Sequence, residues 1–278
     1  MSGPFFSVIV VSFRAGEKLE ETIRNILSQS CQDLEILVQD GGSDDGSYEK
    51  LCAYLSAYGS SDRERIRLRQ EKDQGIYDGM NRALSGAAGQ YIYFLNCGDR
   101  LHDEYVLERV KTYIEAGRSA SEGVPRIYYG DICELRSGQH VAANPNMSHF
   151  AMFRYLPCHQ ACFYDRRLFE TRGFDLRYRV RADYEHFLWC CIRGGGAAVS
   201  TGILIADYEG GGFSETPEGK KRSKEEHRKI TKEYFSGWEN FLFHAYLVLT
   251  LQPLREKLAG GKLTAEIYDG VKNRIYRH

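Results

Sequence analysis

The sequence predicts an α/β fold with a mostly parallel, Rossmann-like sheet, helices on both of its faces, and a C-terminal helical tail. Two observations lead to this prediction. Residues 6–13 (FSVIVVSF) form a continuous β-branched run, which is typical of a strand buried on both faces. The run is followed by apolar residues at helical spacing, and the strand-then-helix order repeats along the first hundred residues. Such alternation favours right-handed crossovers and a parallel sheet.

Four strands are predicted in the first half of the chain. They are residues 6–13, a run from 34 that ends at Asp40, residues 66–70 and residues 90–96. Apolar spacing predicts the accompanying helices: Leu19–Leu27, Tyr48–Leu55, a short helix within 75–89 and a helix from about Glu104 to Ala116.

The second half alternates less regularly. In chain order we expect a hairpin or adjacent strands (126–135 and 138–144), a strand and short helix (161–174), a glycine-capped helix (182–196), a strand entering a Gly-rich loop (197–214) and a charged helix (216–235). Residues 220–233 mix both charge signs, so we expect a mostly solvated helix face there. We predict one domain over 1–215 and a helical extension over 216–278.

The composition argues against several classes of protein. Among 278 residues, 37 Lys and Arg balance 38 Asp and Glu, so no basic excess indicates a nucleic-acid partner. The eight cysteines form no CxxC pair or zinc-binding spacing, which predicts a reducing cytosol without disulfides. The N-terminal MSGPFFSVIVVSF lacks a basic n-region and is interpreted as a strand rather than a signal peptide. The apolar stretch FLFHAYLVLTLQPL is shorter than the ~20 residues that cross a bilayer.

Three of the four predicted strands are followed by, or end at, an aspartate: Asp40, Asp73 and Asp99. Ligands of parallel sheets bind beyond the carboxyl ends of the strands, so these side chains are expected on one rim. Clustered carboxylates are unfavourable unless a cation or strong donors join them. Mg²⁺ or Mn²⁺ would use one or two carboxylates plus substrate phosphates, while a base or ribose could bond the others. The alternative is that Asp and Gly only form turns here.

Common nucleotide and hydrolase motifs are absent, including GxGxxG, the P-loop, GxSxG and HExxH. Instead, "VIVVSFRAGEKLEETIRNILSQSCQDLEILVQDGGSDDGS" resembles the opening block of family 2 glycosyltransferases. The block "QEKDQGIYDGMNRALSGAAGQYIYFLNCGDRL" resembles the GIYDAMN-like and N-x-G-D blocks of a bacterial branch that assembles cell-surface polysaccharides. The resemblance covers residues 6–101, and more loosely extends to about 214. It implies a GT-A fold, with a nucleotide-binding half (1–101) and an acceptor-binding half (102–215).

The resemblance also assigns a nucleotide-sugar site, in which Asp40 would bond the base, commonly uracil. The residues implied are Ser12 and Phe13 in the base pocket, Asp40, and Asp73, Gly75 and Asn81 in the block that closes over the nucleotide. Asp99 matches the last carboxylate of the D-x-D motif, which holds Mg²⁺ or Mn²⁺ on the diphosphate. Asn96 and Gly98 stand where Asp residues are common, and Asn96 could still bond a ribose hydroxyl.

The segment "RVRADYEHFLW" resembles the family segment that carries the catalytic carboxylate at a helix start. Asp183 is the matching position and Glu185 is its rival; a carboxylate that only satisfies the helix dipole is the alternative. His159 could contact phosphate, metal or acceptor, or be a buried structural histidine. Arg181, beside Arg179, could neutralise the leaving diphosphate or be a surface side chain. The late segment YEGGGFSE could form a mobile flap.

These residues favour an inverting glycosyltransferase that moves a sugar from a nucleotide-diphosphate sugar, expected to be UDP-linked, to a hydroxyl of a glycan or lipid-linked acceptor. Two alternatives stay open: a sugar-phosphate nucleotidyltransferase, for which SFRAGEKLEE is poor in glycine and cations, and a non-catalytic sugar-binding relative. The aromatic C-terminal run with basic flanks predicts packing or homodimer contact, or contact with the inner face of the cytoplasmic membrane.

Overall fold

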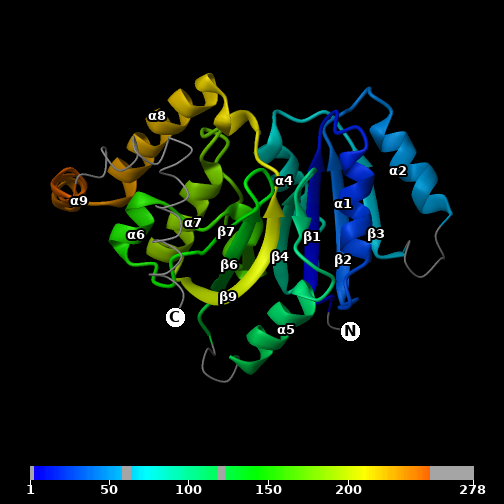
Figure 1. Cartoon of the computed structure of the whole chain (residues 1–278), viewed down its shortest axis with the longest axis horizontal. Coiled ribbons are helices and arrows are strands. Elements are labelled where there is room, and N and C mark those ends of the chain that lie inside the picture. Colours follow the sequence, from blue (N-terminus) through cyan, green and yellow to red (C-terminus); the bar gives the residue numbers. More distant parts are fainter. Residues whose placement is uncertain (1–2, 58–63, 118–122, 251–278) are drawn as a thin grey trace.

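The structure, a computed structural model, describes residues 3–57, 64–117 and 123–250. Within them lies one nine-stranded sheet in the order β3-β2-β1-β4-β8-β6-β9-β5, with β7 paired to β6 (Figure 1). The strands are β1 (Phe6–Ser12), β2 (Leu34–Asp40), β3 (Ile66–Gln70), β4 (Tyr91–Asn96), β5 (Arg100–Leu101), β6 (Arg126–Glu134), β7 (Gln139–Val141), β8 (Cys162–Asp165) and β9 (Ala197–Tyr208).

Helices cover both faces of this sheet (Figure 1). They are α1 (Lys18–Leu27), α2 (Ser47–Ser56), α4 (Ile76–Leu84), α5 (Val106–Ala116), α6 (His149–Arg154), α7 (Ala182–Ile192), α8 (Pro217–Tyr234) and α9 (Gly237–Leu249), with 3₁₀ turns η2 (His159–Ala161), η3 (Arg166–Phe169) and η4 (Phe213–Glu215).

The first half of the sheet is parallel, as predicted. β1 pairs with β2 and β4, and β2 pairs with β3, all in parallel. The register places Ser12 opposite Asp40 and Val11 opposite Asn96. The carboxyl ends of these strands therefore share one edge. The second half is joined differently, because β8 pairs antiparallel with both β4 and β6.

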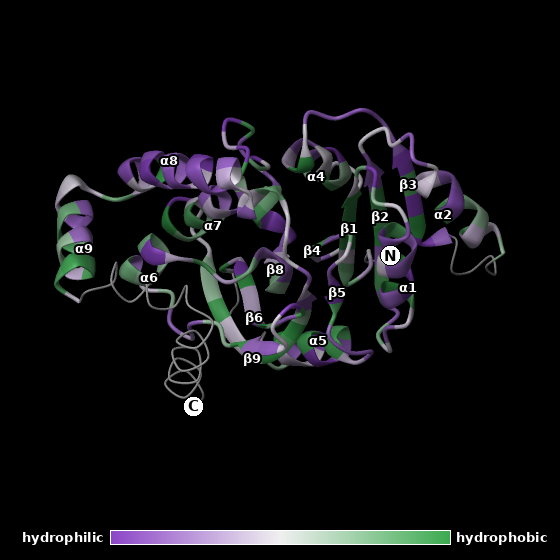
Figure 2. Cartoon of the chain, turned by 45° about the horizontal axis from the view of Figure 1, so that its top comes forward, coloured by the Kyte–Doolittle hydropathy of each residue, from purple (hydrophilic) through white to green (hydrophobic). Residues whose placement is uncertain are grey.

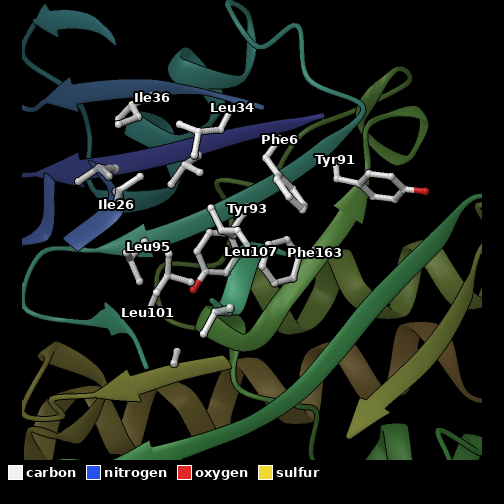
Figure 3. Close-up of a cluster of buried hydrophobic side chains, with 14 of the residues drawn as sticks. Phe6, Ile26, Leu34, Ile36, Tyr91, Tyr93, Leu95, Leu101, Leu107 and Phe163 are labelled. Atoms are coloured by element: carbon white, nitrogen blue, oxygen red, sulfur yellow. The ribbon is translucent and has the colours of Figure 1, made fainter. Parts of the chain in front are cut away.

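Alternate side chains of the central strands enter two separate cores. Phe6 and Val8 of β1 face the core under α1, α2 and α5, whereas Ile9 and Val11 face the core under α4, α6, α7 and α8. In the first core, the ring of Tyr93 stacks on Phe163 of β8 with ring centroids 4.3 Å apart (Figure 3). This contact joins the parallel and antiparallel halves of the sheet.

The α/β fold with helices on both faces is confirmed, and most elements fall where the periodicity placed them. Residues 126–144 form the antiparallel β6–β7 pair. Two elements were not predicted, the two-residue β5 and the six-residue α6. Both are shorter than the window in which an apolar period can be recognised.

Residues 220–233 are mostly solvated, as expected, but one side of α8 is buried. Glu226, Ile230 and Tyr234 are buried, at a spacing of four residues, and Ile230 and Tyr234 lie in the second core. Charged residues cover the remaining surface of the helix, which is largely hydrophilic in Figure 2. Helix α8 begins at Pro217, next to the predicted boundary at residue 216. Its buried side packs in the second core, with residues of the predicted first domain.

Helix α9 lies at the end of the molecule opposite α2 and β3 (Figures 1 and 2). Its Phe243 packs against Phe150 and Phe153 of α6, whereas Trp238 and Phe241 are 67% and 62% exposed. In the described part of the chain, no helix has the length and apolar character needed to cross a bilayer. Residues 251–278 of the predicted extension lie outside the described residues. All eight cysteines are described and are free thiols.

Candidate active site

A cavity of about 860 Å³ brings together residues from both halves of the chain. This volume lies within the range of small-molecule sites. Its lining includes five of the predicted site residues: Asn96, Asp99, His159, Arg181 and Asp183. The first two follow or end β4, and the other three come from the second half. Residues 208–214 of the predicted flap also line this cavity.

Asp99 is a buried carboxylate, only 5% exposed, on the wall of this cavity. Its Oδ1 accepts a hydrogen bond from the Glu209 backbone N–H (2.9 Å), and its Oδ2 accepts one from the Gln160 side-chain amide (2.7 Å). Burial raises the pKa of Asp99 to about 6, although both donors oppose the shift. Asp99 is thus held in one orientation with its charge incompletely compensated.

Four charged residues of the cavity lining were not predicted as site residues: Lys18, Glu209, Lys220 and Lys224. The Lys18 Nζ lies 2.7 Å from the Glu209 carboxylate, although 191 residues separate them. The Glu209 carboxylate lies against Gly98, where any Cβ would collide with it, and the φ of +98° at Gly98 also favours glycine. The YEGGG segment marked this loop, but no local pattern indicated its pairing with Lys18.

Asn96 and His159 bring polar atoms to the same region without internal partners. In the described part of the chain, the Asn96 Oδ1 and both ring nitrogens of His159 are buried and make no hydrogen bond. The His159 ring stacks on Phe94 with centroids 5.2 Å apart. Burial lowers the pKa of His159, so the ring is neutral at pH 7 and brings no charge to a phosphate.

Asp183 is the second residue of α7 and is half-buried at the cavity. Its Oδ1 accepts hydrogen bonds from the Tyr77 hydroxyl (2.9 Å) and from the Tyr184 backbone N–H (2.8 Å). Its Oδ2 makes no hydrogen bond with any of the described residues. One oxygen is therefore fixed while the other is available to a substrate hydroxyl.

Glu185, the rival carboxylate, lies outside this cavity. It is fully buried, pairs with Arg172, and accepts a hydrogen bond from Tyr234. Residues two positions apart on a helix face different sides, which separates it from Asp183. Arg181 does line the cavity, and its Nε donates to Ser223 of α8 (2.8 Å).

Ser12, Phe13 and Asp40 lie apart from this cavity, on a rim around the ends of β1 and β2. Asp40 is fully buried, and its carboxylate accepts from the hydroxyls of Ser12 and Ser43 at 2.6 Å each. The backbone N–H groups of Gly42 and Ser43 and the Gln70 amide also donate to it. Burial alone would raise the pKa of Asp40, but these donors outweigh it and hold the pKa below its usual range. Phe13, which follows Ser12 in the chain, is 61% exposed.

Asp73, Gly75 and Asn81 lie between this rim and the second half. The Asp73 carboxylate lies against the Cα atoms of Gly41 and Gly79 and accepts from the Gly75 N–H (2.9 Å). Asn81 binds the backbone of Phe174 twice: its Oδ1 accepts from the N–H (2.8 Å) and its Nδ2 donates to the carbonyl (2.9 Å). The side-chain amide of Asn81 is thus engaged with the protein itself.

The cavity offers oxygen atoms suited to a hard divalent cation, namely the Asp99 and Glu209 carboxylates and the unpartnered Oδ1 of Asn96. No group of three or more His, Cys, Asp or Glu side chains suited to a metal occurs in the described ranges. These residues fit an ion that is shared with a diphosphate, rather than one held by the protein alone.

A sequence model described as "Glycosyl transferase family 2" matches residues 7–178, more than half of the chain. The chain belongs to glycosyl transferase family 2. Asp183 and α7 lie just beyond the matched residues, whereas the rim and the Asp99 segment of this transferase lie within them.

The transferase is 32% identical to a "PGL/p-HBAD biosynthesis glycosyltransferase" of Mycobacterium bovis over 218 residues, which cover 78% of this chain and 81% of the relative. Its fold is similar to that of a mannosyltransferase from Pyrobaculum calidifontis in complex with GDP-Man and Mn²⁺ (TM-score 0.59, 16% identity, 99% and 88% of the two chains). Staphylococcus aureus TarS 1-349 in complex with UDP-GlcNAc is also similar (TM-score 0.58, 15% identity), although this chain covers only 58% of it. These likenesses show the GT-A fold of the transferase.

Proposed function

We propose that this family 2 transferase is an inverting enzyme that moves a sugar from a nucleotide-diphosphate sugar to a hydroxyl of a glycan or lipid-linked acceptor. The observation that carries the proposal is that Asp99 and Asp183, from different halves of the chain, line one cavity. One carboxylate suits the diphosphate side of the reaction and the other suits the acceptor side. The relative described as a "PGL/p-HBAD biosynthesis glycosyltransferase" supports a role in glycan biosynthesis.

Asp183 is the general base of the proposed reaction. Its Oδ2 would accept the proton of the acceptor hydroxyl as that oxygen attacks the anomeric carbon from the side opposite the diphosphate. The bond between the anomeric carbon and the diphosphate oxygen breaks in the same step. Tyr77 and the Tyr184 N–H hold the other oxygen, so the carboxylate need not reorient.

Asp99 would hold Mg²⁺ or Mn²⁺ on the donor diphosphate, with Glu209 and Asn96 as neighbouring oxygen donors. Such an ion, when bound, stabilises the negative charge that develops on the leaving diphosphate. Lys18 and Arg181 also line the cavity and contribute positive charge for the same group. The similar mannosyltransferase is in complex with GDP-Man and Mn²⁺, which supports a divalent ion as the cofactor.

The rim group of Ser12, Phe13, Asp40, Asp73 and Gly75 is the proposed place of the nucleotide. Phe13 is exposed and offers an aromatic face to a base. Asp40 is fully buried and orders the turn at Gly42 and Ser43, and its bond to the base stays a prediction. We propose UDP as the nucleotide, on the resemblance of the GIYDGMN and NCGD blocks to the polysaccharide-assembling branch. Of the two similar structures, TarS 1-349 is in complex with UDP-GlcNAc and the mannosyltransferase is in complex with GDP-Man. GDP is therefore the competing choice.

A thermal-shift screen tests the donor assignment. With Mn²⁺ present, the cognate UDP-sugar at about 100 times its Kd should raise the melting temperature by about 5–10 °C, because it binds the folded state alone. The same nucleotides with EDTA, and GDP-sugars with Mn²⁺, are the matched controls. A shift with GDP-mannose alone would replace UDP by GDP.

The two alternatives give different results with the same protein. A nucleotidyltransferase would release pyrophosphate from UTP and a sugar phosphate, whereas family 2 membership favours release of nucleoside diphosphate from the sugar donor. A non-catalytic relative would show a thermal shift without any such release. Slow hydrolysis of a UDP-sugar in water would therefore support the transferase over both alternatives.

Helix α9 has an exposed apolar face. We propose that this face contacts the inner face of the cytoplasmic membrane, where a lipid-linked acceptor would be presented. Trp238 stacks on Phe241 and both are exposed, so a Trp238→Ser/Phe241→Ser variant should keep its melting temperature. It should lose co-sedimentation with phosphatidylglycerol vesicles. If instead the wild type ignores vesicles and sediments as a dimer that this variant dissociates, α9 contacts a second copy.

A further inference from the structure

The segment 173–181 precedes the proposed base and is bound by helices from both sides. We infer that α4 and α8 together hold the segment 173–181 in place before Asp183. We also infer that Tyr77 is a positioning residue whose hydroxyl sets the orientation of the Asp183 carboxylate. The inference rests on the proposed function, because it concerns the same base. It gives the GIYDGMN block a role on the acceptor side of the reaction.

The contribution of α4 consists of two side chains one helical turn apart, Tyr77 and Asn81. The Tyr77 hydroxyl lies 2.9 Å from the Asp183 Oδ1 and 3.0 Å from the Val180 carbonyl oxygen. Asn81 holds both backbone polar groups of Phe174. Since positions i and i+4 share one face of a helix, both residues point at the same segment. The face of α4 that carries them is therefore directed at the base.

The Tyr77 ring also packs against Phe174, with ring centroids 5.5 Å apart. Its hydroxyl remains a donor throughout the neutral range, because burial and the nearby charge of Asp183 raise the pKa of Tyr77 well above its usual value. The hydroxyl bond to the Oδ1 of Asp183 holds that oxygen in place and leaves Oδ2 free. A general base needs such a free oxygen to accept a proton.

The contribution of α8 is the buried carboxylate of Glu226. Its Oε1 accepts from the Arg179 N–H (3.0 Å), and its Oε2 accepts from the N–H groups of Val180 and Arg181 (2.9 Å each). Arg222, one turn earlier on α8, donates to the Glu226 Oε1 at 3.0 Å. Three consecutive backbone donors on one carboxylate fix the chain immediately before α7.

Helix α4 also touches the donor side. It begins at Ile76 directly after Gly75, and the Asp73 carboxylate accepts from the Gly75 N–H while lying against Gly79. Helix α4 thus contacts the proposed nucleotide rim at its start, and it holds the segment before Asp183 through Tyr77 and Asn81. A shift of α4 would move the base relative to the donor, and a misplacement of about 1 Å can cost about 100-fold in rate.

The test is Tyr77→Phe, which removes only the hydroxyl. With nucleoside diphosphate release from the UDP-sugar identified in the thermal screen, we expect kcat to fall about 10- to 100-fold and the donor KM to stay within about twofold. Tyr129→Phe is the matched control, since Tyr129 also donates one hydroxyl bond, to the Asn144 carbonyl (2.7 Å), and lies outside the cavity. It should lower the melting temperature without changing kcat.

Hydrogen–deuterium exchange supplies a readout that does not need activity. Peptides spanning 173–183 should exchange faster in Tyr77→Phe and in Glu226→Gln than in the wild type, while the β1–β2 peptides should not change. Unchanged kcat and unchanged exchange in Tyr77→Phe would overturn the inference. An inactive wild type would overturn the proposed function and the catalytic role of Tyr77, and the exchange result would still decide whether α4 holds this segment.

Discussion

Replacing Asp183 by asparagine is expected to reduce transfer by about 10²- to 10⁴-fold, the range that general-base catalysis supplies. Asparagine keeps the size of the side chain and can still accept the Tyr77 hydroxyl bond, so the fold should survive. It cannot accept the proton of the acceptor hydroxyl. The measurement is the initial rate of nucleoside diphosphate release at saturating donor, together with the melting temperature of the variant.

Glu185→Gln is the matched control for Asp183→Asn, because it removes the charge of the neighbouring carboxylate on the same helix. Glu185 pairs with Arg172 in the interior, so its variant should unfold at a lower temperature. Below that temperature its rate per folded molecule should be close to wild type. An active Asp183→Asn enzyme, or an inactive but folded Glu185→Gln enzyme, would overturn the assignment of the base.

Asp99→Asn is expected to abolish the metal-dependent part of donor binding while it stabilises the free protein at pH 8. Burial raises the pKa of Asp99 from 3.8 to about 6, so folding favours the protonated form. The protonated carboxyl stabilises the folded state fully at pH values below 3.8, the pKa of Asp99 in the unfolded chain. This stabilisation is lost as the pH rises through about 6, its pKa in the folded chain. At pH 8 the charged carboxylate therefore costs up to about 3 kcal/mol. The neutral amide avoids this cost but loses one of the two accepted hydrogen bonds, which is worth about 1 kcal/mol.

The measurement is the unfolding free energy of both proteins from pH 5 to 8, without nucleotide, and the thermal shift with UDP-sugar and Mn²⁺. The stability gain of Asp99→Asn should shrink as the pH falls through about 6. Asp40→Asn is the matched control of opposite sign, because its hydrogen-bond donors lower the pKa of Asp40 and stabilise the charged form. It should be destabilised at pH 8. Equal stability of Asp99→Asn and wild type at both ends of this range would contradict the prediction.

Much of the fold could be predicted because its signals are local. The apolar runs of β1, β2 and β4 and the helical spacing after them could be recognised without knowledge of tertiary contacts. The alignment of strand ends followed from the parallel order alone. The short elements β5 and α6 were missed because two to six residues carry no recognisable period.

The candidate site could be predicted only in part, and Asp183 and Glu185 show why. Both stand in the same family-like segment; the resemblance matches Asp183, but Glu185 stayed a rival because a spacing of two residues does not show which side chain faces the cavity. The turn of α7 directs Asp183 to the cavity and Glu185 to Arg172 and Tyr234. The same limit applied to Asn81, whose motif indicated the nucleotide but whose amide binds the Phe174 backbone.

The α/β architecture, the family resemblance, and Asp99 and Asp183 as candidate site carboxylates are all predictable from the amino-acid sequence without a structure. Periodicity and short motifs are properties of neighbouring residues, so they can be read before folding. Three contacts became visible only in the folded chain: Glu209 pairs with Lys18 beside Gly98, Tyr77 holds Asp183, and Glu226 of a charged helix binds the backbone at 179–181. These contacts join residues 45 to 191 positions apart, and packing of distant elements creates them.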